Sequence, residues 1–163
     1  MQRNWYNTRP AKNEDFQAIA AFPQNEEELY YMFPKAVYPL TAEQLLEAKR
    51  QRFEATVVTC NNEVVGYANF YEAIPDEHCS IGNLVVHPQY RSRGVATFLI
   101  TAMEQLAQEK YNATEVHISC FDANTKGLLL YAKLGYKPYD IERRIKYNGD
   151  PIALIEMKKA MNG

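Results

Sequence analysis

The sequence predicts a single α/β domain built on a mixed sheet. With 163 residues, the chain has the ordinary length of one domain, and no repeat or Pro/Gly/Ser-rich linker divides it. Hydrophobic residues make up 47% and charged residues 23%, which is the composition of a globular protein and not of a disordered one. Apolar residues recur with a period of about two in some segments and about 3.6 in others, so strands alternate with helices. We therefore expect one domain over residues 1–163.

The first forty residues are expected to form short elements. Thr8–Ala11 is a short opening strand. Asn13 is a suitable N-cap for a helix over Glu14–Ala21, which Pro23 ends. The next segment, Gln24–Leu40, is rich in aromatic residues and is cut by prolines, so it cannot be one long helix.

A helix and a hairpin follow. Thr41–Gln44 has the capping-box pattern and opens a helix that runs to about Arg52. Ala55–Cys60 and Val64–Phe70 read as strands, and Asn61-Asn62 is the tight turn that joins them.

The second half of the chain alternates strand and helix and ends in a hairpin. Gly135 is well placed as the residue that stops the second of these helices, and Asn148-Gly149 is a turn signal. In order, the predicted elements are a strand over Cys79–Val86, a helix from the residue after Gly94 to Glu109, a strand over Val116–Cys120, a helix over Asn124–Leu134, and the hairpin strands Lys137–Lys146 and Ile152–Met157.

Charge and cysteine usage exclude several classes of protein. The formal net charge is −2, so no global field attracts nucleic acid or an anionic membrane. Cys60, Cys79 and Cys120 lie far apart, and the histidines form no HxH or HxxxH pair, which argues against a metal site. The sequence has no secretory apolar region and no membrane-spanning run. A soluble, cytoplasmic protein is expected, and a homodimer is left open.

The segment between the third strand and its helix is the first candidate site. In Arg91-Ser92-Arg93-Gly94-Val95-Ala96 a turn rich in arginine leads directly into a helix. A helix start exposes unpaired N–H groups and the positive end of the dipole, which suits a pyrophosphate. The alternative is a solvated helix start with two surface arginines. No G-x-x-x-x-G-K-[ST] or G-x-G-x-x-G motif occurs, which disfavours a P-loop NTPase and a Rossmann dehydrogenase.

Two motifs together resemble the GNAT N-acetyltransferase superfamily. Its acetyl-coenzyme A loop, [RQ]-x-x-G-x-[GA], fits Arg91, Gly94 and Ala96, and its second signature, N-x-x-[AG]-x-x-L-Y-x-K-x-G-[FY], fits Asn124–Tyr136. The resemblance implies a mixed, mostly antiparallel central sheet flanked by helices, with acetyl-CoA as co-substrate and no metal. Phe33–Leu40, together with Gly82-Asn83 and Ile118–Phe121, is further similar to a bacterial subgroup that acetylates lysine in peptides.

The resemblance also implies a role for each cofactor-binding residue. The third strand would pair with the pantetheine arm through its backbone, and the loop would hold the pyrophosphate through backbone amides and arginine side chains. Asn124 would contact the cofactor arm, and Lys133 is the lysine of the second motif. The implied cofactor-binding set is Leu84, Val85, Val86, Arg91, Ser92, Arg93, Gly94, Val95, Ala96, Thr97, Asn124 and Lys133.

Tyr131 is the candidate catalytic residue. The resemblance places its hydroxyl at the thiol sulfur, where it would protonate the departing thiolate. A free tyrosine titrates near pH 10, so it stays protonated at neutral pH and can still donate. The alternative is a helix tyrosine that merely packs on the sheet.

The family pattern fails at the general base. Several members carry a glutamate on the strand before the loop, but His78–Asn83 contains no carboxylate. Glu104 lies opposite the apolar stripe of its helix and is expected to be solvated. Glu72 or His78 acting directly, or a water chain ordered by Asn83 and Ser119, remain candidates, and no base is assigned.

The acceptor is expected to be a primary amine. Glu26-Glu27-Glu28 is followed by Tyr30, Tyr31 and Tyr38, and an acidic, aromatic wall suits a cationic amine. The alternative is a solvated helix start. A peptide lysine is the first candidate acceptor and a small polyamine or drug-like amine is the second. A non-catalytic acyl-CoA sensor of the same fold is the rival from another class.

Overall fold

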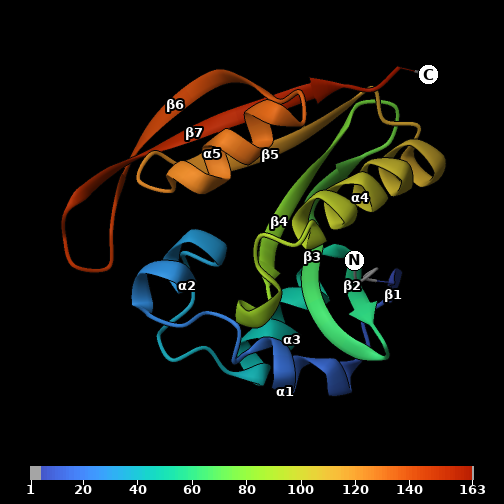
Figure 1. The fold of residues 1–163 in the computed structure, drawn as a ribbon. Helices are drawn as coiled ribbons and strands as arrows, with labels where there is room; N and C mark the ends of the chain where they lie inside the picture. Colours follow the sequence, from blue (N-terminus) through green and yellow to red (C-terminus); the bar gives the residue numbers. More distant parts are fainter. Residues whose placement is uncertain (1–4, 163) are drawn as a thin grey trace.

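The computed structural model describes residues 5–162, whose strands form one seven-stranded sheet in the order β1-β2-β3-β4-β5-β7-β6. Within these residues β4 and β5 run parallel, and every other neighbouring pair is antiparallel. The prediction of a mixed, mostly antiparallel sheet is confirmed (Figure 1).

The predicted order of strands is confirmed, with longer strands in the middle of the chain, and the structure adds a helix, α2 (Glu26–Met32), in the segment where none was assigned. β3 continues to Ile74, past the predicted end at Phe70, and β4 begins at His78. The strands are β1 (Tyr6–Pro10), β2 (Phe53–Cys60), β3 (Glu63–Ile74), β4 (His78–Val86), β5 (Glu115–Phe121), β6 (Lys137–Ile145) and β7 (Pro151–Ala160). The helices are α1 (Phe16–Ile19), α2 (Glu26–Met32), α3 (Ala42–Gln51), α4 (Val95–Tyr111) and α5 (Thr125–Lys133), with 3-10 turns at Asn13–Asp15 and Pro88–Tyr90.

The predicted helix over Glu14–Ala21 is wrong in its start and its length. Residues 13–15 form a 3-10 turn and only α1 is α-helical. Asn13 is the first residue of this turn and not an N-cap, and its Oδ1 accepts a hydrogen bond from Lys49 Nζ at 2.9 Å. Asp15 binds the turn instead, accepting from the Lys12 N–H at 2.7 Å while it pairs with Arg9 at 2.8 Å.

The predicted capping box at Thr41 is half right. Thr41 Oγ1 accepts from the Gln44 N–H at 3.3 Å and begins α3. The Gln44 side chain does not reach back to Thr41. It bonds both backbone groups of Val37, accepting from the N–H at 2.8 Å and donating to the carbonyl at 3.1 Å. A long polar side chain at a helix start therefore holds the preceding loop in place.

The glycine and asparagine turn signals are confirmed. Asn61 and Asn62 both have positive φ, 51° and 68°, as a tight two-residue hairpin requires. Gly149 has φ 88° in the turn between β6 and β7.

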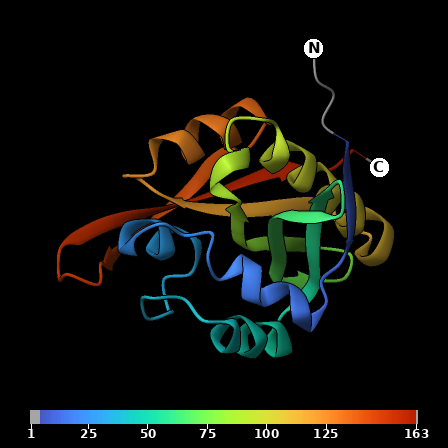
Figure 2. The same ribbon diagram turned by 60° about the horizontal axis from the view of Figure 1, so that its bottom comes forward.

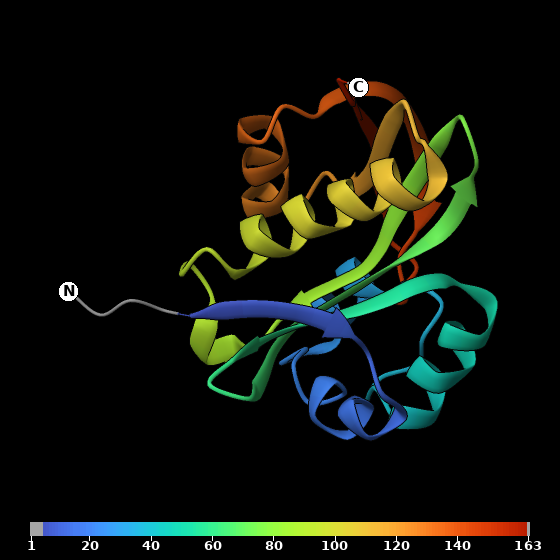
Figure 3. The same ribbon diagram turned by 90° about the vertical axis from the view of Figure 1, so that its right-hand side faces the viewer.

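Helices cover both faces of the sheet and enclose two cores. α4 and α5 lie on one face, while α1, α2 and α3 lie on the other (Figures 2 and 3). Leu99 and Met103 of α4 are buried in the first core, and Phe16 and Leu45 are buried in the second. Neighbouring strand residues point to opposite faces, so β2 contributes to both cores. Within residues 5–162, no helix has the length and apolar character that a membrane span requires.

Candidate functional site

A cavity of about 1180 Å³ opens where β4 and β5 separate. The parallel ladder between them runs only from the His78–Glu115 pair to the Ile81–Ile118 pair. Beyond this fork, residues 82–86 of β4 and 119–121 of β5 line the cavity instead of bonding to each other. Small-molecule pockets commonly measure roughly 300–1,000 Å³, so this cavity has room for a large ligand together with part of a second one.

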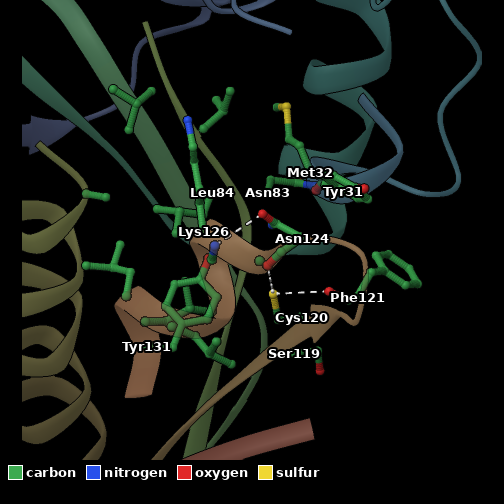
Figure 4. Close-up of a pocket in the computed structure, with 18 of the residues that line it drawn as sticks. Tyr31, Met32, Asn83, Leu84, Ser119, Cys120, Phe121, Asn124, Lys126 and Tyr131 are labelled. Carbon is green, nitrogen blue, oxygen red and sulfur yellow. Dashed lines mark hydrogen bonds between the residues drawn. The ribbon is translucent and has the colours of Figure 1, made fainter. Parts of the chain in front are cut away.

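β4 presents an open backbone edge to this cavity. The predicted residues Leu84, Val85 and Val86 all line it (Figure 4 labels Leu84). The His87 N–H bonds back to the Val65 carbonyl of β3 at 2.8 Å. Because hydrogen-bonded and non-bonded pairs alternate in an antiparallel ladder, Val86 turns its own N–H away from β3 and toward the fork. The unpaired edge can therefore bond an extended amide-bearing ligand.

Asn83 helps to shape this edge, and its side-chain amide is not free to bind a ligand. It has φ 53° and is buried. Its Nδ2 donates to the Met32 carbonyl at 3.1 Å, and its Oδ1 accepts from Asn69 Nδ2 at 3.0 Å. Both amide atoms therefore have protein partners, and Asn83 joins β4 to α2.

The loop before α4 leads directly into the helix after Gly94, as predicted. Ser92 and Gly94 have φ of 62° and 83°, and Gly94 is the N-cap of α4. The first N–H groups of a helix have no acceptor within the helix. Of the predicted loop residues, Ser92, Gly94, Val95, Ala96 and Thr97 line the cavity. A ring of helix-start N–H groups therefore faces the end of the β4 edge.

Arg93, also predicted to bind the cofactor, is not among the residues that line the cavity. Its carbonyl accepts a hydrogen bond from the Tyr6 hydroxyl at 2.8 Å, and its guanidinium lies 5.6 Å from the Tyr90 ring. The bond to Tyr6 holds the loop against β1, and the contact with Tyr90 is to the 3-10 turn that precedes the loop.

Arg91 lines the cavity, but Glu28 of α2 holds its side chain. Two parallel hydrogen bonds of 2.8 and 2.9 Å join the guanidinium to the carboxylate. Further bonds reach the carbonyls of Phe22 at 3.0 Å and Val86 at 3.3 Å. The predicted phosphate-binding side chain therefore ties the loop to the opposite wall.

α5 supplies the other wall (Figure 4). Asn124 is its N-cap, with Oδ1 accepting from the Gly127 N–H at 3.2 Å, so its side chain stabilises the helix while the residue lines the cavity. Lys126, in the first turn, also lines the cavity and was missed by sequence reasoning. A lysine beside a predicted helix start was the signal. Lys133, predicted to bind the cofactor, is exposed at the far end of α5 and is not among the lining residues.

Tyr131 lines the cavity from α5, on the side of Cys120 (Figure 4). Burial raises the pKa of Tyr131 well above its usual value, so the phenol stays protonated at neutral pH. Among the hydrogen bonds between described residues, none involves its hydroxyl, which leaves the proton available to a ligand. Burial also raises the pKa of Cys120 to about 12, so this thiol is a poor nucleophile.

The first predicted base candidates lie elsewhere. Glu72 and His78 pair with each other at 2.6 Å, and neither lines the cavity. His117 stacks on His78 with ring centroids 4.1 Å apart and bonds Glu115 at 3.0 Å, and it does not line the cavity either.

The expectation that Glu104 is solvated is wrong. Its side chain is only 13% exposed and pairs with Lys159 at 3.1 Å. It also accepts from the Tyr136 hydroxyl at 2.7 Å. α4 packs against the end of β7 at this point, which buries a position that the helix pattern alone leaves outside.

The predicted acidic wall is largely neutralised. Glu28 is held by Arg91, and Glu27 pairs with Lys146 at 2.8 Å and with the Tyr147 hydroxyl at 3.0 Å. These partners lower the pKa of both glutamates. Tyr30 is buried against Phe121, with centroids 4.7 Å apart, and only Tyr31 of the predicted tyrosines lines the cavity. Glu27 and Glu28 therefore attach α2 to neighbouring segments, and their charges are already paired, which differs from the expected role of this segment.

In place of the expected acidic wall, residues at the end of α3 and on the last strands line this side of the cavity. Arg52 is half-buried between the rings of Phe33 and Tyr71, 5.6 and 5.7 Å away. It occupies space left by Gly82, whose missing Cβ would lie 2.7 Å from Arg52 Nη1. Glu156 of β7 lines the same part of the cavity. Sequence reasoning missed both residues, although a glycine inside a strand was a signal for the first.

Comparison with known proteins adds to this geometry. Residues 13–136 match the Acetyltransferase (GNAT) family. The catalytic subunit NAA10 of the Arabidopsis thaliana N-terminal acetyltransferase A complex is 29% identical over 148 residues, covering 89% of this chain and 70% of that protein.

Solved structures share the fold. The ribosomal-protein-S18-alanine N-acetyltransferase from Escherichia coli has a TM-score of 0.75 at 17% identity, covering 98% of this chain and 97% of that one. The structure of yncA from Salmonella typhimurium, with its cofactor acetyl-CoA, has a TM-score of 0.72 at 18% identity, covering 96% and 94%.

Proposed function

Because this chain belongs to the acetyltransferase (GNAT) family and is an N-acetyltransferase that uses acetyl-CoA, we propose that it transfers the acetyl group directly to a primary amine of a peptide or protein. One observation carries the proposal: the open edge of β4, the N-terminus of α4 and Tyr131 meet at one cavity. An anion site, an amide-binding edge and a proton donor are the parts that transfer from a thioester requires.

The cavity residues fit acetyl-CoA. The N–H groups at the start of α4 suit the pyrophosphate, with Lys126 adding positive charge. The edge at Leu84 and Val86 would bond the amides of the pantetheine arm, as a further strand would. Acetyl-CoA supplies the activated acyl group when bound. Arg91 has a positioning role in this proposal, because its ion pair with Glu28 fixes the loop that would bind the pyrophosphate.

Tyr131 protonates the departing thiolate in this proposal. Its buried phenol is neutral at neutral pH and lines the cavity from α5. Direct transfer needs no covalent enzyme intermediate, which agrees with the high pKa of Cys120. The tyrosine then recovers a proton from the nitrogen of the acylated product.

The N-terminal α-amine of a protein is the acceptor we favour. The similarity to NAA10, whose name states N-terminal acetylation, supports it. A peptide lysine, favoured by the resemblance of Phe33–Leu40, is the second candidate, and a small amine is the third.

A matched panel of acceptors tests this proposal. One peptide has a free N-terminus and no lysine, the second has a blocked N-terminus and one lysine, and spermidine is the third acceptor. Thiol release and mass spectrometry of the product are measured together. We expect acetylation of the first peptide. Preference for the second peptide would overturn the α-amine assignment alone. Preference for spermidine, or turnover of none of the three, would overturn the proposed function.

A further inference from the structure

Glu156 lies at the fork where the acyl end of the ligand would lie. In the β5–β7 ladder Glu156 is directly opposite Ser119, one residue beyond the last β4–β5 pair at Ile118. An arm that starts at the α4 N-terminus and follows β4 from Val86 to Gly82 runs toward this point. Ser119 and Glu156 are therefore placed near the reacting end of the ligand and not near its phosphates.

Glu156 and Tyr131 face the fork from opposite sides of the sheet. Directly opposed residues of an antiparallel pair share a face, and successive residues of a strand alternate between faces. Ser119 lies 3.4 Å from the Tyr71 hydroxyl, so Glu156 shares the face of Tyr71. Cys120 is on the other face, with α5 and Tyr131. A thioester in the fork would have the proton donor on one side and the carboxylate on the other.

The charges around the cavity single out Glu156 for an ammonium group. Of the residues that the structure describes, Glu28 and Glu156 are the carboxylates that line the cavity, and Arg91 already holds Glu28. The cationic residues that line the cavity are Lys35, Arg52, Arg91, Lys126 and Arg144. For a protonated amine that enters this cavity, Glu156 is therefore the lining carboxylate that no cation already holds.

We propose that Glu156 is a catalytic residue that binds the ammonium group of the acceptor and takes its proton, and this inference rests on the proposed function. The ammonium gives one proton to the Glu156 carboxylate and becomes a neutral amine. Its lone pair forms the new C–N bond while the C–S bond breaks, and Tyr131 protonates the sulfur. The nitrogen then loses its second proton to the Tyr131 oxygen, and Glu156 releases its proton to water.

The surroundings of Glu156 make its carboxylate a stronger base than that of an ordinary exposed glutamate. Burial raises the pKa of Glu156, and the carboxylates of Glu142 and Asp140 on β6 raise it further, while Arg144 lowers it. From β5 the opposed side chain is the neutral Ser119, and Arg52 lines the cavity from α3. A base is most effective when its pKa approaches the working pH.

The test compares Glu156→Gln with Glu109→Gln, a matched charge change at an exposed position of α4 outside the cavity lining. The acceptor is the panel amine with the highest kcat/KM, together with its aminooxy analogue, which is neutral at pH 7. We expect Glu156→Gln to lower kcat/KM for the amine about 100-fold at pH 7, within the range of general-base catalysis. The loss should largely disappear with the aminooxy acceptor, and Glu109→Gln should stay within about threefold of wild type.

The pH profile supplies an independent readout. In wild type, kcat/KM should be flat between the pKa of Glu156 and that of the amine. In Glu156→Gln it should rise about tenfold per pH unit up to the amine pKa, because only free amine then reacts. Glu156→Asp keeps a carboxylate and should keep the flat region.

Folding is checked in the same variants. A carboxyl with a raised folded pKa destabilises the protein once pH exceeds that pKa, so Glu156→Gln should melt no lower than wild type at pH 7. Wild-type kinetics in Glu156→Gln, or an equal loss with the aminooxy acceptor, would overturn the role of Glu156 and leave the proposed function standing. An inactive wild type would overturn both.

Discussion

Tyr131, Cys120 and Glu156 line one cavity, and burial is the first cause that raises the pKa of each. A raised pKa has a different chemical consequence for each group, because a phenol, a thiol and a carboxyl group differ in what their neutral and charged forms can do. A neutral phenol is still a proton donor, a neutral thiol is no longer a good nucleophile, and a carboxylate with a raised pKa becomes a stronger base. Burial on the α5 face of the sheet thus favours proton donation by Tyr131 and disfavours covalent catalysis by Cys120, while the pKa of Glu156 on the other face is also raised by neighbouring carboxylates.

The Tyr131→Phe variant tests the acid at this scale. It keeps the ring and deletes the proton donor, so kcat should fall about 100-fold, while acetyl-CoA affinity changes less than twofold. Steady-state thiol release and calorimetry measure the two quantities. Tyr139→Phe, which removes an exposed hydroxyl outside the cavity lining, is the matched control. A kcat within twofold of wild type would show that Tyr131 does not donate the proton.

At the scale of elements, the β4–loop–α4 unit brings the candidate site together. The strand supplies an open edge because β5 diverges after Ile118, and the left-handed Gly94 turns the chain into α4. The Arg91–Glu28 pair fastens this unit to α2, which lies on the opposite wall. Loop, strand and helix are therefore held as one frame.

Gly94→Ala tests the loop, with Gly149→Ala as its control. Both glycines have positive φ, 83° and 88°, and a Cβ at either would meet no atom within 4 Å. Both variants should therefore be destabilised by a similar backbone strain of roughly 1–2 kcal/mol. Only Gly94→Ala should weaken acetyl-CoA binding, by about tenfold in calorimetry, because it displaces the helix-start N–H groups. Equal binding by the two variants would exclude the loop from the site.

At the scale of the whole molecule, local patterns predicted the order of strands and helices and much of one wall of the site. Turn residues such as Asn61-Asn62 act within a few positions, and the loop motif from Arg91 to Ala96 lies on one strand–helix junction. The sequence therefore contains these features in short, readable segments.

The other wall depends on contacts between distant segments. Glu28 meets Arg91 across 63 positions, and Glu104 meets Lys159 across 55, so neither pairing follows from local pattern. Glu156 left a weak signal. It follows the buried Ile152 and Leu154 on the same face of β7, where alternation predicts another apolar residue. A carboxylate at that position is the kind of exception that a functional site produces.

The central claim is that the fork between β4 and β5 holds the acyl-CoA ligand. Hydrogen–deuterium exchange of the wild-type protein, with and without coenzyme A, measures this directly, because bound N–H groups exchange more slowly. Protection is predicted at residues 84–86 and 92–97, with little change in the β6–β7 turn at residues 146–150. Unchanged exchange at the fork under saturating coenzyme A, or protection confined to other segments, would contradict the account.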